Sequence, residues 1–399
     1  MIRAATSLTL DTSLDFVKAG KEASCAIPDL SESGSRLPDR RNLRLACNQR
    51  QHTRQVAASS TGLRTLLEWW DVYNYGGEAH DSDARGDRFR YRSGGLTIAA
   101  DRPLPGLVVD QSGHGIALDL SAGSRRSVPG VVPPGRRLVD PDEERKSRLG
   151  VVRDGDGYLV RFFSQCDVRI SADLGRATYF RDPGANDLLV DQLMAGTLLA
   201  VVLALRGTCV LPASAVDVRG RALGFVGHSG MGKSTLALAT CAAGARLISE
   251  DVLAVTAAAQ PTCLAGNAEI RLRRKSASLA ERLEGAELTR TVDGRQAVRP
   301  QRTQLDAVPL DTLVVPRPSR RAQRLTVQEM PRAEALFRLI AFPRLHGLKD
   351  PNIARVQFEV IGRIVRSVPV LLVTVPWGPP FMEDLGEQLL ALMTNDSRR

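Results

Sequence analysis

The chain has 399 residues and 43% hydrophobic content, which is enough to bury one large core or two ordinary ones. Its formal net charge is +10, but only 6 of its 54 basic residues are lysine. The arginines are spread along the chain and form no basic block interleaved with aromatic residues. This distribution argues against a nucleic-acid surface, so we expect no nucleic-acid partner.

Cysteine spacing and the first residues of the chain indicate its cellular compartment. The six cysteines form neither a CxxC pair nor a zinc-type spacing with histidine, which is typical of free thiols in a reducing environment. They are Cys25, Cys47, Cys166, Cys209, Cys241 and Cys263. The first twenty residues contain Asp11, Asp15 and Lys18 and lack the continuous apolar run of a signal peptide. We therefore expect a cytoplasmic protein with no membrane partner.

Residues 1–87 differ in composition from the rest of the chain. They mix Ser, Arg, Asp and Pro with little periodicity, and only Leu63–Tyr75 has the pattern of a short helix. We expect a disordered leader, and a docking segment is the alternative.

Short apolar runs separated by turn residues follow between residues 88 and 182, and they predict a small β-rich domain. The predicted strands are Leu96–Ala99, Leu107–Val109, Ile116–Leu120, Gly150–Val152, Tyr158–Phe163, Val168–Ile170 and Ala177–Phe180. We expect the stretch from Pro129 through Arg137 to be a loop.

Residues 183–399 alternate between helical and strand patterns, which predicts an α/β domain. An apolar helix is expected over Asn186–Leu205, and its most apolar part, Leu193–Leu205, is too short to span a bilayer and fits a buried helix. Next come a glycine-rich loop, a helix over Lys233–Ala243 and a strand at Leu247–Ile248, and the loop is preceded by strands at Cys209–Leu211, Ala215–Val218 and Ala222–Val226. Later strands are expected at Thr312–Val315, Leu325–Gln328 and Val368–Val375, and later helices at Arg332–Ala341, Ile353–Val365 and Phe381–Met393.

The glycine-rich loop matches the phosphate-loop pattern G-x-x-x-x-G-K-[ST], for which this composition gives roughly 0.005 chance matches. An apolar strand precedes the loop and a strong helix follows it, so backbone N–H groups and the helix N-terminus would face one anion. In this pattern the lysine reaches the β- and γ-phosphates and the following hydroxyl binds Mg²⁺. We expect ATP to be bound by Gly227, His228, Ser229, Gly230, Met231, Gly232, Lys233, Ser234 and Thr235.

Two acids, Glu250 and Asp251, follow the short strand only 17 residues after Lys233. A strand beside the phosphate loop would bring both carboxylates to the metal and the γ-phosphate. One acid could bind Mg²⁺ while the other accepts a proton from the incoming hydroxyl. We therefore expect Lys233, Glu250 and Asp251 to be catalytic, and Ser234 and an acid to hold the metal.

These residues resemble the HPr serine kinase/phosphorylase family. Its G-x-S-G-x-G-K-S loop matches Gly227–Ser234, its pair of acids matches Glu250-Asp251, and its His-Gly-containing strand aligns with Pro212–Val218. The resemblance is tightest over residues 208–255. It implies an α/β fold with an HPr kinase-like phosphate-loop domain at 183–399 and a small β-rich domain at 88–182. It also implies that Glu250 is the general base and that Asp251 lies nearer the metal, so we expect Ser234 and Asp251 to hold Mg²⁺.

Two departures from the family pattern bear on the activity. The family's catalytic histidine falls on Pro212, and Glu250 stands where the family usually has aspartate. A branch of this family that phosphorylates a serine of lasso-type peptide precursors is a second resemblance. It rests on Tyr91-Arg92-Ser93-Gly94-Gly95-Leu96 and on Ile270–Arg273.

The sequence thus predicts an ATP- and Mg²⁺-dependent serine kinase whose partner is a small protein or peptide with an acceptor serine. An HPr kinase/phosphorylase that regulates carbon use is one alternative. A module that senses ATP without transferring phosphate is the other, and Pro212 is its best support. Whether the chain forms a homo-oligomer is left open.

Overall fold

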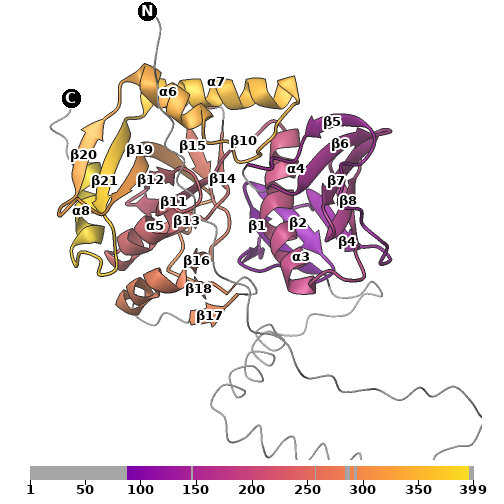
Figure 1. Cartoon of the computed structure of the whole chain (residues 1–399), viewed down its shortest axis with the longest axis horizontal. Helices are drawn as coiled ribbons and strands as arrows, with labels where there is room; N and C mark the ends of the chain where they lie inside the picture. Colours follow the sequence, from indigo (N-terminus) through magenta and orange to yellow (C-terminus); the bar gives the residue numbers. More distant parts are fainter. Residues whose placement is uncertain (1–87, 145–146, 257, 284–287, 292–293, 395–399) are drawn as a thin grey trace, which may run out of the picture. The chain divides into compact units, whose positions relative to one another are not determined.

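The computed structural model describes residues 88–394, apart from residues 145–146, 257, 284–287 and 292–293. The leader expected at residues 1–87, the helix expected at Leu63–Tyr75, and Cys25 and Cys47 lie outside the described residues. The described part is a mixed α/β structure with two large sheets (Figure 1).

The first sheet contains nine strands within the described residues, in the order β3-β1-β2-β4-β9-β8-β7-β6-β5. Their bounds are β1 Phe89–Ser93, β2 Leu96–Ala100, β3 Val108–Val109, β4 Leu118–Ala122, β5 Arg136–Val139, β6 Leu149–Asp154, β7 Gly157–Phe162, β8 Cys166–Ile170 and β9 Arg176–Arg181. The loop expected through Arg137 is wrong at its end, because β5 pairs with β6 at the edge of the sheet. This strand exposes Arg136 and Arg137 and buries Leu138 and Val139, so its charged start hides the strand pattern.

One continuous helical stretch packs against the first sheet. It comprises α3 (Asp187–Leu193), a π-helical turn η1 (Met194–Leu198) and α4 (Leu199–Leu205). Its apolar side chains join the same core as the sheet, as expected for a buried helix. Among the described residues it is the one helix long and apolar enough to cross a membrane, and most of it is buried inside the protein. The predicted boundary between residues 182 and 183 stays a prediction.

A buried carboxylate in α3 makes stability depend on pH. Asp191 is 5% exposed and lies 3.1 Å from Nε of Arg102. Burial raises the pKa of Asp191 from 3.8 to about 6, although Arg102 and Arg181 oppose the rise. Between pH 3.8 and about 6, Asp191 is therefore protonated in the folded state and ionised in the unfolded state. The free energy of unfolding is consequently larger at low pH and falls as the pH rises through this range.

We expect the free energy of unfolding of the protein to fall relative to that of Asp191→Asn as the pH rises from about 4 to 6. The fall should approach about 3 kcal/mol, and the difference should be constant above the upper value. Urea denaturation of both proteins across this range measures it. A difference that does not change with pH would show that the carboxyl titrates alike in both states.

The second sheet has the order β10-β14-β15-β19-β12-β11-β13, with β21 paired to β19 and β20 paired to β21. Its strands are β10 Cys209–Leu211, β11 Ala213–Val218, β12 Arg221–Val226, β13 Arg246–Ser249, β14 Leu253–Val255, β15 Thr262–Leu264, β19 Ala307–Ser319, β20 Thr326–Glu329 and β21 Val370–Pro376. The strands β12, β19 and β21 run parallel to one another, so their carboxyl ends meet at one edge.

Helices cover both faces of the second sheet. They are α5 Lys233–Ala242, α6 Arg332–Ile340, α7 Pro351–Ser367 and α8 Leu385–Thr394. Apolar residues of α6 and α7 share one core with the sheet, and those of α5 and α8 share the other. Successive residues of β19, such as Leu313 and Val314, enter opposite cores, as the two-residue period of a strand requires. Burial on both faces explains why Ala222–Val226 is continuously apolar.

A small third sheet follows in the order β16-β18-β17. It consists of β16 Ile270–Leu272, β17 Leu288–Arg290 and β18 Gln296–Val298, and the 3-10 helix η2 spans Arg274–Arg282. Arg271 lies in β16 and Arg273 directly follows it, and both line the cavity in front of the phosphate loop, as described below.

The four described cysteines are buried and free, as the sequence predicts for them. Burial raises the pKa of the thiols of Cys166, Cys209, Cys241 and Cys263 to about 12.

Candidate functional site

The phosphate loop joins the end of β12 to the start of α5 at the carboxyl edge of the second sheet. Gly230 and Gly232 adopt left-handed φ values of 89° and 93°, and a Cβ at either position would meet open space. Gly232 directly precedes α5, whose first intrahelical bond runs from Leu236 N–H to the Gly232 carbonyl. The N–H groups of the first turn are therefore available to an anion in front of the helix.

Lys233 extends from the first residue of α5 under the loop. It is 8% exposed, and its Nζ donates a hydrogen bond to the His228 carbonyl at 3.1 Å. Burial lowers the pKa of Lys233, whereas Asp251 and Glu250 oppose that fall. The ammonium is thus held where a phosphate oxygen could replace the carbonyl as its partner.

Glu250 lies beside the hydroxyl of the phosphate loop. Ser234 Oγ donates to one carboxylate oxygen of Glu250 at 2.5 Å, and the buried Ser214 of β11 donates to the other. The Glu250 N–H donates to the Asn267 carbonyl at 3.0 Å, which fixes the backbone after β13. Burial is the main reason that the pKa of Glu250 is raised, and the two serine hydrogen bonds counteract it.

Asp251 faces a different direction from its neighbour. Its backbone is left-handed, with φ of 63°, a conformation that few non-glycine residues adopt and that often marks functional sites. Its side chain is 46% exposed and lies 3.1 Å from the Arg344 guanidinium. Arg344 is the main reason that the pKa of Asp251 is lowered, so the carboxylate is ionised at neutral pH.

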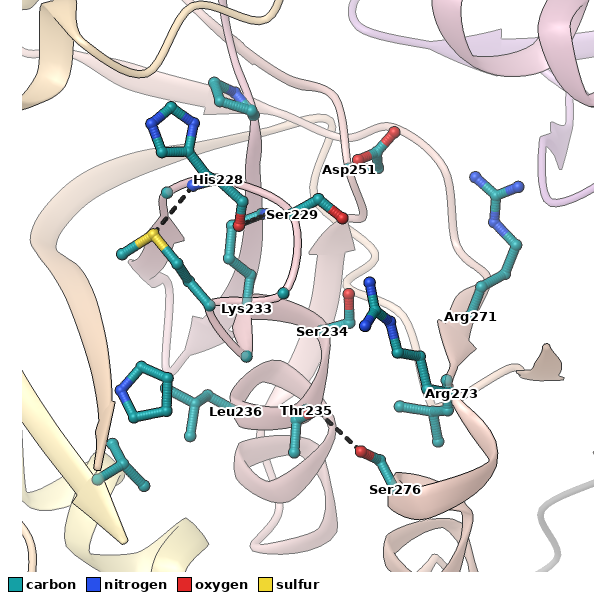
Figure 2. A pocket seen from close by; sticks show the side chains of 18 of the residues that line it. His228, Ser229, Lys233, Ser234, Thr235, Leu236, Asp251, Arg271, Arg273 and Ser276 are labelled. Atoms are coloured by element: carbon teal, nitrogen blue, oxygen red, sulfur yellow. Dashed lines mark hydrogen bonds between the residues drawn. The ribbon is translucent and has the colours of Figure 1, made fainter. Parts of the chain in front are cut away.

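A cavity of about 910 Å³ lies in front of these groups. All residues predicted from the sequence for the site line it: the whole loop Gly227–Thr235, Glu250 and Asp251. Figure 2 shows part of this set, with Lys233, Ser234 and Asp251 labelled. The structure therefore brings the predicted residues together, while their chemical roles remain predictions. The His228 ring packs edge-on against Phe342 with 4.6 Å between the ring centres, which fits a role in shaping the loop.

Sequence reasoning missed a set of five arginines that also line the cavity. They are Arg271, Arg273, Arg295, Arg320 and Arg344, and they come from four separate parts of the chain. Figure 2 shows Arg271 and Arg273 on the same side of the phosphate loop as Asp251 and Ser234. Arg271 also donates to Gln192 of α3 at 3.3 Å, and Arg344 approaches Thr197 of the π-helical turn at 3.5 Å. Side chains of the helical stretch that packs on the first sheet thus help to hold Arg271 and Arg344 in position.

Pro212, which the sequence resemblance aligns with a histidine, lines the cavity. It offers the loop a carbonyl, which accepts a hydrogen bond from Gly227 N–H at 3.4 Å, but no side-chain acid or base. Ser214, two residues later, supplies the polar contact from this strand by binding Glu250. Pro212 therefore supplies no proton acceptor, and the side chains lining the cavity that could accept a proton are the acidic pair and the imidazoles of His228 and His346.

The donor set fits Mg²⁺ bound together with a nucleotide. The Ser234 hydroxyl and the Glu250 carboxylate are neighbouring oxygen groups that could serve as ligands, and Mg²⁺ in phosphotransfer sites takes such oxygens plus substrate phosphates. Among the residues that the structure describes, no group of three or more His, Cys, Asp or Glu side chains could hold a metal ion.

No protein-family model matches the chain, and no curated protein matches it either. Among solved structures, the chain has a weak likeness to the Hpr(Ser) kinase/phosphatase from Coxiella burnetii. The TM-score is 0.25 and the identity is 11%, over 47% of this chain and 95% of that one. A likeness of this size carries no argument about activity, so the functional proposal depends on the site itself.

Proposed function

We propose that the protein is an ATP-dependent phosphotransferase that moves the γ-phosphate to a serine of a small protein or peptide. The observation that carries this proposal is the 2.5 Å contact between Ser234 of the phosphate loop and Glu250 after β13. A phosphate-loop hydroxyl beside a strand-end carboxylate is the arrangement with which nucleotide-hydrolysing and phosphotransfer sites hold Mg²⁺.

Each group then has a defined task. The amides of the loop and Lys233 bind the β- and γ-phosphates, and Ser234 and Glu250 hold Mg²⁺, which neutralises charge on the phosphates when bound. Arg344, Arg271 and Arg295, which act on Asp251, supply further positive charge at the transferring phosphate, where such charge is most effective.

We assign the general base to Asp251 and the metal contact to Glu250. This assignment is the reverse of the one implied by the family resemblance. Glu250 is buried and both of its oxygens accept hydrogen bonds from serines, so it is poorly placed to receive a substrate proton. Asp251 is partly exposed in the cavity and kept ionised by Arg344. A carboxylate can suffice as the base because phosphoryl transfer depends mainly on positioning and charge neutralisation.

The test is incubation of the purified protein with Mg·ATP and a library of serine-, threonine- and tyrosine-containing peptides and small proteins, including HPr. Mass spectrometry would identify any phosphorylated product. We expect phosphoserine in the product of the wild-type protein and about 10²- to 10³-fold less of it with Lys233→Met in the same time.

ATP binding without transfer to any acceptor would instead support the ATP-sensing alternative, which the absence of a side-chain base at Pro212 favours. Transfer to HPr together with release of that phosphate would support the HPr kinase/phosphorylase alternative.

A further inference from the structure

The cavity has a second end on the opposite side of the phosphate loop from the acids. The local strand order is β13-β11-β12-β19-β21. Glu250 follows β13, two strands to one side of β12, and Trp377 follows β21, two strands to the other side. All of these groups line the same cavity, whose phosphate loop lies between them.

This order fixes the direction of a bound nucleotide, given the proposed function. If the terminal phosphate lies toward the carboxylates, the ribose and base extend along the edge of the sheet toward β19 and β21. Neighbouring strands are about 4.8 Å apart, so Trp377 is displaced about 10 Å from β12 across the sheet. The strand register puts Phe225 level with Leu371, so Trp377 also lies six residues, about 20 Å, beyond Phe225 along the strands, at the carboxyl edge from which the phosphate loop projects. Ligands of parallel sheets bind along this carboxyl edge.

Trp377 has the properties of a stacking surface. Its side chain is 52% exposed, and the Arg320 guanidinium lies 5.5 Å from the centre of its ring. Its backbone is held in place, because its N–H donates to the Ser319 carbonyl at 3.0 Å. A large aromatic side chain exposed inside a polar cavity is a common platform for a planar ligand.

The segment after Trp377 is also anchored. Arg282 of η2 donates to the carbonyls of Phe381, Met382 and Glu383 at 2.9–3.2 Å. The ring of Phe381 covers Gly378, so a side chain at that glycine would collide with it. The tryptophan is therefore presented by a fixed wall of the cavity before any ligand arrives.

We propose that Trp377 is the stacking platform for the nucleobase and determines that a nucleotide, not an inorganic polyphosphate, is the phosphate donor. This inference rests on the proposed function, because it requires the triphosphate to lie on the loop. Stacking on an aromatic ring uses the π-face that every base has, so the platform adds affinity without reading base-edge hydrogen bonds.

Isothermal titration with Mg·ATP and with magnesium tripolyphosphate tests the inference. Trp377→Ala should bind ATP about 10- to 100-fold more weakly, the effect of removing one base–aromatic stack. It should bind tripolyphosphate as the wild-type protein does, and Trp377→Phe should recover most of the ATP affinity. Phe358→Ala is the matched control, since Phe358 is 55% exposed on α7 and does not line the cavity.

Three results would overturn the inference while leaving the proposed function intact. They are unchanged ATP affinity in Trp377→Ala, an equal loss of ATP and tripolyphosphate affinity, and an effect confined to the KM of the peptide acceptor. If the wild-type protein binds neither ATP nor tripolyphosphate, the proposed function fails and the inference fails with it.

Discussion

Replacing Lys233 by alanine should reduce phosphate transfer by about 10²- to 10³-fold, the cost of removing one preorganised charge from a transferring group. The ammonium is buried beneath the loop and is held by a backbone carbonyl, so it is already positioned for a phosphate oxygen. ATP binding should weaken as well, because the lysine contacts the phosphates in the ground state. Initial rates of labelled-phosphate transfer and titration with ATP measure the two effects.

The folded state should survive this change. Burial lowers the pKa of Lys233, which means that the protein pays to keep the charge in place. Lys233→Met retains the length of the side chain without its charge and should be equally inactive. Lys349→Ala is the control, because Lys349 does not line the cavity. Transfer at the wild-type rate in Lys233→Ala or Lys233→Met would show that the phosphate site is elsewhere.

The two acids should separate by role when each is replaced by its amide. Asp251→Asn should lower turnover by about 10²- to 10⁴-fold at saturating Mg²⁺, the usual contribution of a general base, with little change in ATP affinity. Glu250→Gln should instead raise the Mg²⁺ concentration needed for half-maximal activity by about 10- to 100-fold, as the loss of a metal partner does. A Mg²⁺ titration at fixed ATP distinguishes them.

The reverse outcome has a clear meaning. If Glu250→Gln loses turnover at all Mg²⁺ concentrations and Asp251→Asn shifts only the Mg²⁺ requirement, the roles implied by the family resemblance are correct. Thermal unfolding of each variant serves as the control, since Glu250 bridges Ser214 and Ser234 in the core of the site.

Local patterns predicted the elements around the phosphate loop well. The apolar strand before it and the helix after it appear as β12 and α5, and the long apolar helix appears at Asp187–Leu205. The first strand, Phe89–Ser93, was missed because three of its five residues are only partly buried or exposed. The strands between Leu253 and Val298 were missed because each has only three residues, too few to show a period.

The candidate site was predictable only where its residues are close in sequence. The loop and the two acids lie within 25 residues, from Gly227 to Asp251, and all line one cavity. Arg295, Arg344 and Trp377 reach the cavity through folding of distant segments, so no local spacing reveals them. The hydrogen bonds that favour exchanged roles for Glu250 and Asp251 depend on side-chain direction, which adjacent positions in a sequence do not specify.

Parallel transfer assays with ATP labelled at the γ-phosphate and at the α-phosphate test the central claim most directly. The phosphotransferase proposal predicts that a serine acceptor gains the γ-label with the wild-type protein, gains no α-label, and gains the γ-label about 10²- to 10³-fold more slowly with Lys233→Met. Appearance of the α-label in the acceptor, or transfer of the γ-label at the wild-type rate with Lys233→Met, would contradict it.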